Sequence, residues 1–235
     1  LDHTNSIYTW YRQNTLGNKD VKWETVKKTN FGIDYGFLGG LITGSLDFFC
    51  DRRNDILIFG DNRSIPSYFG TTAPTINKGK VRTSGYELEL KLNKKFANGI
   101  RLWGNINMTH AKNKVLLKDD AQLTPNYQKE AGYSMGQYHS YIDRGFINDI
   151  DDLIGSPAHE SNDNHRLVGD YYIVDFNGDG VVDSKDSAPV GYSSNPQNTY
   201  NATIGIEYKG FSAFAQFYGV TNVTRDVTLT SFGNK

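Results

Sequence analysis

The chain has 235 residues and a formal net charge of −1 at pH 7, so its charge gives no indication of a nucleic-acid partner. It has one cysteine, Cys50, which excludes an internal disulfide. No apolar run approaches the ~20 residues that a membrane-spanning helix needs. Hydrophobic residues make up 37%, which suits a soluble protein and also a membrane barrel, where every second residue of a strand faces a wet lumen.

The first predicted elements are two strands, at about 26–37 and 41–51, joined by a tight turn. In the first strand, Phe31 and Ile33 alternate with polar residues and glycines. Gly39-Gly40 supplies the positive φ angles that a tight hairpin requires. A connection rich in Gly, Pro and Ser follows, so the next strand begins only near residue 80.

The clearest alternation lies in two predicted strands at about 80–93 and 100–112, which are joined by the Asn98-Gly99 hairpin signal. One face of the first strand carries Tyr86, Leu88, Leu90 and Leu92, and the other carries Glu87, Glu89 and Lys91. The apolar face stays free of charge for about nine residues, the length that a tilted strand needs to cross a bilayer. A lipid-facing charge at mid-membrane would cost roughly 2–4 kcal/mol, so its absence indicates membrane strands.

A long polar stretch, 113–197, precedes the last two predicted strands, at about 199–208 and 211–220. The outward face of the last strand cannot be assigned from its sequence, and a further strand near 6–11 is possible. Short and long connections alternate along the chain, as the periplasmic turns and extracellular loops of outer-membrane barrels do. We expect short helices or strands within 113–197, because structureless loops of that length are rare.

The predicted fold is all-β: a segment of an antiparallel transmembrane β-barrel with long extracellular loops, embedded in the lipid bilayer of the bacterial outer membrane. The residues predicted to face the lumen are Glu87, Glu89, Lys91, Arg101, Trp103, Asn105 and Glu207. An open strip of such strands would leave unpaired edges, so we expect the closing strands to come from a longer protein from which both ends of this chain are cut.

Residues 175–186 match the spacing of a twelve-residue calcium loop. The predicted ligands are side-chain oxygens of Asp175, Asn177, Asp179, Asp183 and Asp186 and the carbonyl of Val181. Gly180 would make the sharp turn, and hard oxygen ligands favour calcium over zinc. The alternative is an Asp/Asn/Gly turn without metal. A bound ion would act as a structural clip of the long loop.

No catalytic constellation accompanies these features, and the chain is not expected to be an enzyme. The acidic run at 149–152 is interpreted as a solvated surface rather than a pair of glycosidase carboxylates. The long loop is rich in aromatic residues: Tyr127, Tyr133, Tyr138, Tyr141, Phe146, Tyr171, Tyr172 and Tyr192. These rings either pack loop on loop or, as a group, offer a surface for glycans.

Several blocks together resemble the SusC-like (RagA-type) family of TonB-dependent outer-membrane transporters from Bacteroidetes. They are, in the order of that family, Leu16–Thr25, Asn30–Leu38, Thr43–Phe49, Asp55–Leu57, Asn77–Leu88, Gly132–Phe146, and Gly169–Tyr172 with Asp175–Gly180. Each block alone is weak, but the set covers nearly the whole chain. The final segment departs from the pattern, because the family's "QG-x-x-G" element is followed only in part after Phe211–Tyr218.

The resemblance implies a barrel of about 22 strands with an N-terminal plug. It also implies energy from the TonB complex, a SusD-like lipoprotein as extracellular lid, and oligosaccharides or peptides as substrates. The residues alone leave one alternative open, a soluble secreted β-sandwich that contains calcium and binds carbohydrate. In that fold the same apolar faces would form a core between two sheets.

Overall fold

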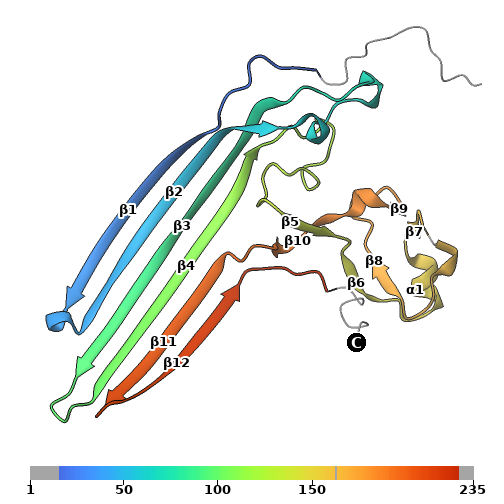
Figure 1. The fold of residues 1–235 in the computed structure, drawn as a ribbon. Coiled ribbons are helices and arrows are strands. Elements are labelled where there is room, and N and C mark those ends of the chain that lie inside the picture. The colour runs from blue at the N-terminus through green and yellow to red at the C-terminus, as the bar shows by residue number, and fades with distance from the viewer. Residues whose placement is uncertain (1–15, 162, 228–235) are drawn as a thin grey trace, which may run out of the picture.

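The computed structural model describes residues 16–161 and 163–227, so the possible strand near 6–11 lies outside the described residues. Six long strands form one curved antiparallel sheet (Figure 1). In spatial order they are β1 (Thr25–Phe37), β2 (Ile42–Ile58), β3 (Ile76–Lys95), β4 (Arg101–Leu117), β11 (Asn198–Tyr208) and β12 (Phe211–Thr221). The prediction of an all-β, antiparallel barrel segment is therefore confirmed, with the barrel left open between β1 and β12 in the described residues.

Three strands run further than the sequence predicted, all at the same end of the sheet. β2 continues to Ile58 instead of ending at 51, β3 begins at Ile76 instead of 80, and β4 continues to Leu117 instead of 112. The charged segment after residue 50 resembles a turn in the sequence. In the structure the ladder passes through it by way of a bulge that follows Arg53, and Asp55 takes a left-handed φ of 57°.

The connections at the two ends of the sheet differ in length (Figure 1). At one end lie the turn at η1 (Leu38–Gly40), the turn at 96–99, and the two-residue turn Lys209-Gly210. Lys209 and Gly210 both have positive φ angles, 47° and 85°, as a type I′ hairpin turn requires. The opposite end carries the connection 59–75, which contains η2 (Gly60–Asn62) and η3 (Ser67–Phe69), and the long segment 118–197.

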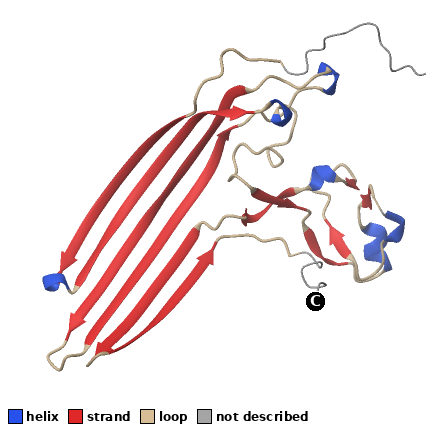
Figure 2. Ribbon diagram, viewed as in Figure 1, coloured by secondary structure: helices blue, strands red, loops and turns tan. Residues whose placement is uncertain are grey.

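Segment 118–197 folds into a small lobe beside the end of the sheet that carries the long connections (Figure 2). Three two-stranded pairings build it: β5 (Gln137–Ser140) with β10 (Ala188–Ser193), β6 (Asp143–Phe146) with β8 (Tyr171–Ile173), and β7 (Ala158–His159) with β9 (Val181–Val182). It also holds α1 (Ile150–Gly155), η4 (Asp163–His165) and η5 (Ser184–Asp186). Asp149, from the predicted solvated run, caps α1 by accepting a hydrogen bond from Asp152 N at 2.8 Å.

Few apolar side chains are buried in the described residues, and those few lie in the lobe or at the neighbouring end of the sheet. They are Ile58, Ala73, Val115, Ile147, Val182 and Ala188. Among the described residues no second sheet covers the six-stranded one, and Phe31 and Phe217 are 63% and 62% exposed. The sandwich alternative is therefore wrong, because its two faced sheets and the core between them are missing from this part of the chain.

Within the described residues, no helix combines the length and the apolar character needed to cross a membrane.

Candidate functional site

The strand register places all seven residues predicted to face the lumen on one face of the sheet. Glu89 pairs with Asn107, Lys91 with Asn105, and Arg101 with Glu207 across neighbouring strands. Because side chains alternate along a strand, residues in such cross-strand pairs share a face with every second neighbour. We call this the polar face. Whether it lines a lumen stays a prediction, since the described strands do not close.

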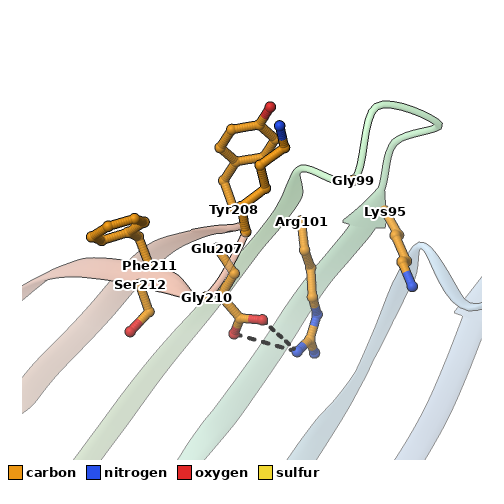
Figure 3. A pocket seen from close by; sticks show the side chains of 9 residues that line it. Lys95, Gly99, Arg101, Glu207, Tyr208, Gly210, Phe211 and Ser212 are labelled. Carbon is orange, nitrogen blue, oxygen red and sulfur yellow. Dashed lines mark hydrogen bonds and ion pairs between the residues drawn. The ribbon is translucent and has the colours of Figure 1, made fainter.

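The polar face has a hollow of about 670 Å³ at the end of the short turns, shown in Figure 3. Lys95 and Glu207 are the cross-strand neighbours of Arg101 on its two sides, and all three side chains project to the same side of the sheet. Arg101 Nη1 lies 3.3 Å from Glu207 Oε2, and Arg101 Nε donates to Asn93 Oδ1 at 3.0 Å. One cation in the hollow, Lys95, makes no ion pair within the described residues, so the hollow suits an anionic or polar group.

Tyr208 projects to the opposite side of the sheet in Figure 3. It belongs to the second face, which carries the predicted apolar rows and which we call the apolar face. Register resolves the strand that the sequence left open: Ala202 pairs with Phe217 and Ile204 with Ala215, so Phe217 and Ala215 lie on the apolar face. In β1–β4, β11 and β12 this face carries no Asp or Glu, and Phe31, Phe211 and Phe217 are largely exposed on it.

Sequence reasoning named Glu87 but missed the acidic group to which it belongs on the polar face. Asp47 and Glu87 stand directly opposite each other on β2 and β3, and Asp34 and Asp51 lie on the same face. None of these four makes an ion pair within the described residues. The alternation of 26–37 and 41–51 carried this signal, because each carboxylate falls opposite a row of apolar side chains.

The predicted calcium loop is held by its own backbone. Asp175 accepts hydrogen bonds from the amides of Gly178 and Gly180, both at 2.7 Å, and Asp186 accepts from those of Phe176 and Asp183 at 2.7 and 2.8 Å. Asp186 is fully buried. Across the described residues, no three His, Cys, Asp or Glu side chains converge in a way that could hold a metal ion.

Lys185 places a positive charge beside two of the predicted calcium ligands. Lys185 Nζ lies 2.7 Å from Asp183 Oδ2 and 3.5 Å from Asp179 Oδ2. The hydrogen bond from Lys185 lowers the pKa of Asp183, and the amide of Val181 lowers the pKa of Asp179. Hydrogen bonding to Asp183 in turn raises the pKa of Lys185. Backbone amides and Lys185 thus contact the predicted ligand carboxylates, and calcium binding stays a prediction.

A buried carboxylate ties the lobe to the sheet. Asp119, just after β4, accepts from Arg63 Nε at 3.1 Å and from Lys78 Nζ at 2.5 Å. The hydrogen bond from Lys78 is the main reason why the pKa of Asp119 lies below its usual value. Three segments far apart in the sequence, the 59–75 connection, β3 and the start of the lobe, therefore meet at one ion-pair cluster.

The predicted aromatic residues of the lobe divide into two groups. Tyr127 packs edge-on against Phe176, with ring centroids 4.8 Å apart, and its hydroxyl donates to the Lys185 carbonyl at 2.7 Å. Phe146 and Tyr171 are cross-strand neighbours on β6 and β8, stacked with centroids 4.9 Å apart, and are 57% and 58% exposed. The first group holds the lobe together, whereas the second presents free ring surface to solvent.

A separate contact joins Arg144 to Tyr172, whose ring centroid lies 4.7 Å from the guanidinium carbon. Tyr172 follows Tyr171 directly in β8, so its side chain points to the opposite face of the strand. The stacked pair Phe146–Tyr171 is called the aromatic patch below, and its exposed rings suit ligands that offer a sugar ring or an apolar side chain.

One sheet with an apolar face free of carboxylates, a polar opposite face and connections segregated by length is typical of the wall of an outer-membrane β-barrel. The family model of the TonB dependent receptor-like β-barrel matches residues 4–234. The chain therefore belongs to the TonB-dependent receptor β-barrel family, and its place is the bacterial outer membrane.

Named relatives agree with this assignment. The chain is 25% identical over 209 residues to the TonB-dependent receptor P3 of Formosa agariphila, a match that covers 83% of this chain and 20% of that protein. A shorter stretch of 74 residues is 34% identical to the TonB-dependent receptor SusC of Bacteroides thetaiotaomicron, covering 31% of this chain and 7% of SusC. The chain thus spans about a fifth of the length of the first relative, and these relatives are receptors rather than enzymes.

Solved structures show the same fold. The RagAB peptide importer in its closed-closed state superposes with a TM-score of 0.61 at 19% identity, covering 89% of this chain and 22% of that one. Its open-open state gives the same TM-score at 17% identity. The resemblance to SusC-like and RagA-type proteins expected from the sequence is confirmed.

Proposed function

We propose that this chain supplies part of the wall and one extracellular lobe of a TonB-dependent importer, which takes up a nutrient across the outer membrane. The observation that carries the proposal is the division of the sheet into an apolar face without carboxylates and a polar face with charged and amide side chains. Such a division separates lipid from a passage. Family membership supports it, because the named relatives are TonB-dependent receptors.

The partners of the whole protein follow from the same reasoning. A SusD-like lipoprotein is proposed as the extracellular lid, and the TonB complex as the source of energy through a plug outside this chain. Likeness to SusC and to the RagAB peptide importer supports these two partners. The lobe lies at the end of the sheet that carries the long connections, the end where a lid would sit.

The proposed cargo is an oligosaccharide or a peptide, and the aromatic patch is the proposed contact for it outside the barrel. Phe146 and Tyr171 offer adjacent exposed ring faces, which stack on sugar rings or on apolar side chains at little entropic cost. Calcium, if it binds at 175–186, is proposed to act only as a structural clip.

Uptake by intact cells tests the proposal. A strain that lacks the full-length gene, and a second that lacks TonB, are grown on panels of purified glycans and of peptides as the sole nutrient. We expect at least one member of one panel to require both genes, and that panel identifies the cargo class. Growth that is unchanged by deletion on every glycan and peptide of the panels would refute the import function.

The contribution of the patch is tested in the same strain by complementation with the double substitution Phe146→Ala with Tyr171→Ala. We expect slower uptake at limiting substrate, since stacked aromatic contacts contribute about 0.5–1.5 kcal/mol beyond their buried area. Ile154→Ala is the matched control, because Ile154 is an apolar side chain of the same lobe that is 77% exposed. Equal uptake by the double variant and the control would exclude the patch as a cargo contact.

A further inference from the structure

Four neighbouring strands carry a cation at the same level of the sheet. Lys27 of β1 pairs with Arg52 of β2, Arg52 pairs with Arg82 of β3, and Arg82 pairs with Lys114 of β4. Cross-strand partners share a face, so the four form one continuous line, called the basic row below. With strands about 4.8 Å apart, the basic row extends over about 15 Å.

The basic row lies on the apolar face. Lys27 and Phe31 lie four positions apart in β1, and Arg52 and Phe48 lie four positions apart in β2, so each cation shares a face with the apolar side chains of its own strand. A fifth cation, Lys112, lies one step closer to the apolar rows on the same face. The strand carboxylates in this region, Asp51 and Glu87, are on the other face.

The basic row has no anionic partner within the described residues. All four side chains of the basic row are exposed, and none makes an ion pair in the described part of the chain. Like charges that stand directly opposite each other on neighbouring strands destabilise a sheet. Arg53, one position further along β2, faces the other side and is paired with Glu24 at 3.2 Å. The basic row therefore lacks the counter-charge that the neighbouring Arg53 has in Glu24.

The position of the basic row indicates what kind of anion would neutralise it. It lies towards the long connections, which are extracellular in an outer-membrane barrel, and directly above the rows that face hydrocarbon. A ligand that neutralises the row while staying in contact with those rows must carry anionic groups at the membrane surface and acyl chains below it. A soluble anion would satisfy only the first condition.

We propose that the basic row binds the phosphate groups of an outer-leaflet glycolipid of the lipopolysaccharide type, whose acyl chains lie along the apolar face. Lys27, Arg52, Arg82 and Lys114 contact the phosphates, with the arginines able to bind them in a bidentate manner. The lipid neutralises four cations that the sheet holds side by side. This inference depends on the membrane location of the chain and is independent of the nutrient that the importer carries.

The experiment uses the purified full-length protein in detergent. Binding of bisphosphorylated lipid A and of enzymatically dephosphorylated lipid A with the same acyl chains is measured by native mass spectrometry. The test variant is Arg52→Gln with Arg82→Gln, and the matched control is Lys28→Gln with Arg53→Gln, which removes two cations from the same end of the sheet but from its other face.

We expect the phosphorylated lipid to bind the wild type and the control alike, and the test variant about 30-fold more weakly, the loss that two membrane-surface cations confer. The dephosphorylated lipid should bind all three proteins equally weakly. Equal affinity of the wild type for the two lipids, or an unchanged affinity of the test variant, would overturn the proposal. Nutrient uptake that persists in the test variant separates this result from a failure of the importer function.

Discussion

The indole ring of Trp103 on β4 lies over Gly205 of β11, in the space that a Cβ atom at residue 205 would occupy. Glycine weakens a strand interior because it has no side chain to pack, and a ring from the neighbouring strand compensates for that loss. Two further aromatic residues do the same: Tyr35 covers Gly44, and Phe49 covers Gly85. Tyr35 also donates a hydrogen bond to the Glu89 carbonyl at 3.2 Å, so its side chain reaches from β1 to β3.

Substitution of Gly205 should displace this ring. Gly205→Ala places a methyl group against Trp103, and we expect a loss of about 1–3 kcal/mol in the free energy of unfolding, as for other overpacked sites. The matched control is Gly36→Ala, since a Cβ at residue 36 would meet only Thr43 Cγ2 at 3.7 Å. Thermal unfolding of the full-length protein in detergent measures both. Equal midpoints for the two variants would show that Trp103 moves aside at no cost.

The two faces of the sheet should differ in their tolerance of charge. Ile106 lies in the middle of the apolar face of β4 and Asn105, its neighbour, lies on the polar face. We expect Ile106→Arg to cost roughly 2–4 kcal/mol of stability in a bilayer and Asn105→Arg to cost far less. Folding of the full-length protein into lipid vesicles, followed by gel mobility with and without heating, provides the comparison. A larger penalty at Asn105 would mean that the faces are assigned the wrong way round.

The ion-pair cluster at Asp119 should hold the lobe in place. Asp119→Asn leaves Arg63 and Lys78 without their charged partner, and we expect a local loss of about 1.5–3 kcal/mol, reduced by the solvent exposure of Lys78. Limited proteolysis of intact cells should then cleave the lobe faster. Glu130→Gln serves as the control, because the pair of Glu130 with Lys118 is exposed. Identical cleavage rates in the two variants would assign the attachment of the lobe to other contacts.

The same cluster predicts a dependence on pH. The pKa of Asp119 is lower in the folded protein than in the unfolded chain, mainly because of the hydrogen bond from Lys78. Its stabilising contribution is therefore complete above the unfolded pKa of about 4 and is lost as the pH falls through the lower folded value. Proteolysis of the lobe by an acid-active protease should accelerate below about pH 4 in the wild type but much less in Asp119→Asn. Parallel acceleration in both proteins would exclude Asp119 as the titrating group.

Calcium binding is tested by adding calcium or a chelator to the full-length protein. If the loop 175–186 binds the ion, calcium should raise the melting temperature of the wild type, and Asp175→Ala with Asp179→Ala should abolish that shift. Asp151→Ala is the control, because Asp151 is an acidic residue of α1 outside the loop. If neither calcium nor chelator changes the melting temperature of the wild type, the loop is an Asp/Asn/Gly turn closed by Lys185.

The sequence predicted the two faces of β3 because charged and apolar residues alternate there without exception from Tyr86 to Leu92. It could not assign β12, where Phe211 and Phe217 occupy one face and Phe214 and Tyr218 the other. Only the pairing with β11 separates these aromatic residues. Local alternation is a short-range signal, whereas register is a long-range one.

For the candidate site, the sequence predicted which residues share a face but not which of them are in contact. Arg101 and Glu207 were assigned to one face, but their contact depends on the pairing of β4 with β11 across the whole lobe. The sequence pointed to Phe146 and Tyr171 among the aromatic residues of the long loop. It could not predict their stacking, because β6 and β8 are only a few residues long and are brought together by contacts within the lobe. The basic row was also overlooked, because each strand contributes a single cation and only the register of the sheet aligns the four.

β4 and β11 pair without a bulge from Arg101 and Glu207 to His110 and Asn198, although the entire lobe is inserted between them. For β4 and β11 to pair in this way, the two ends of the lobe need only lie side by side. A lobe of another sequence could therefore connect the same two strands without a change in the sheet. In the proposed importer, a different lobe would change the surface offered to ligands outside the membrane while the wall stayed the same.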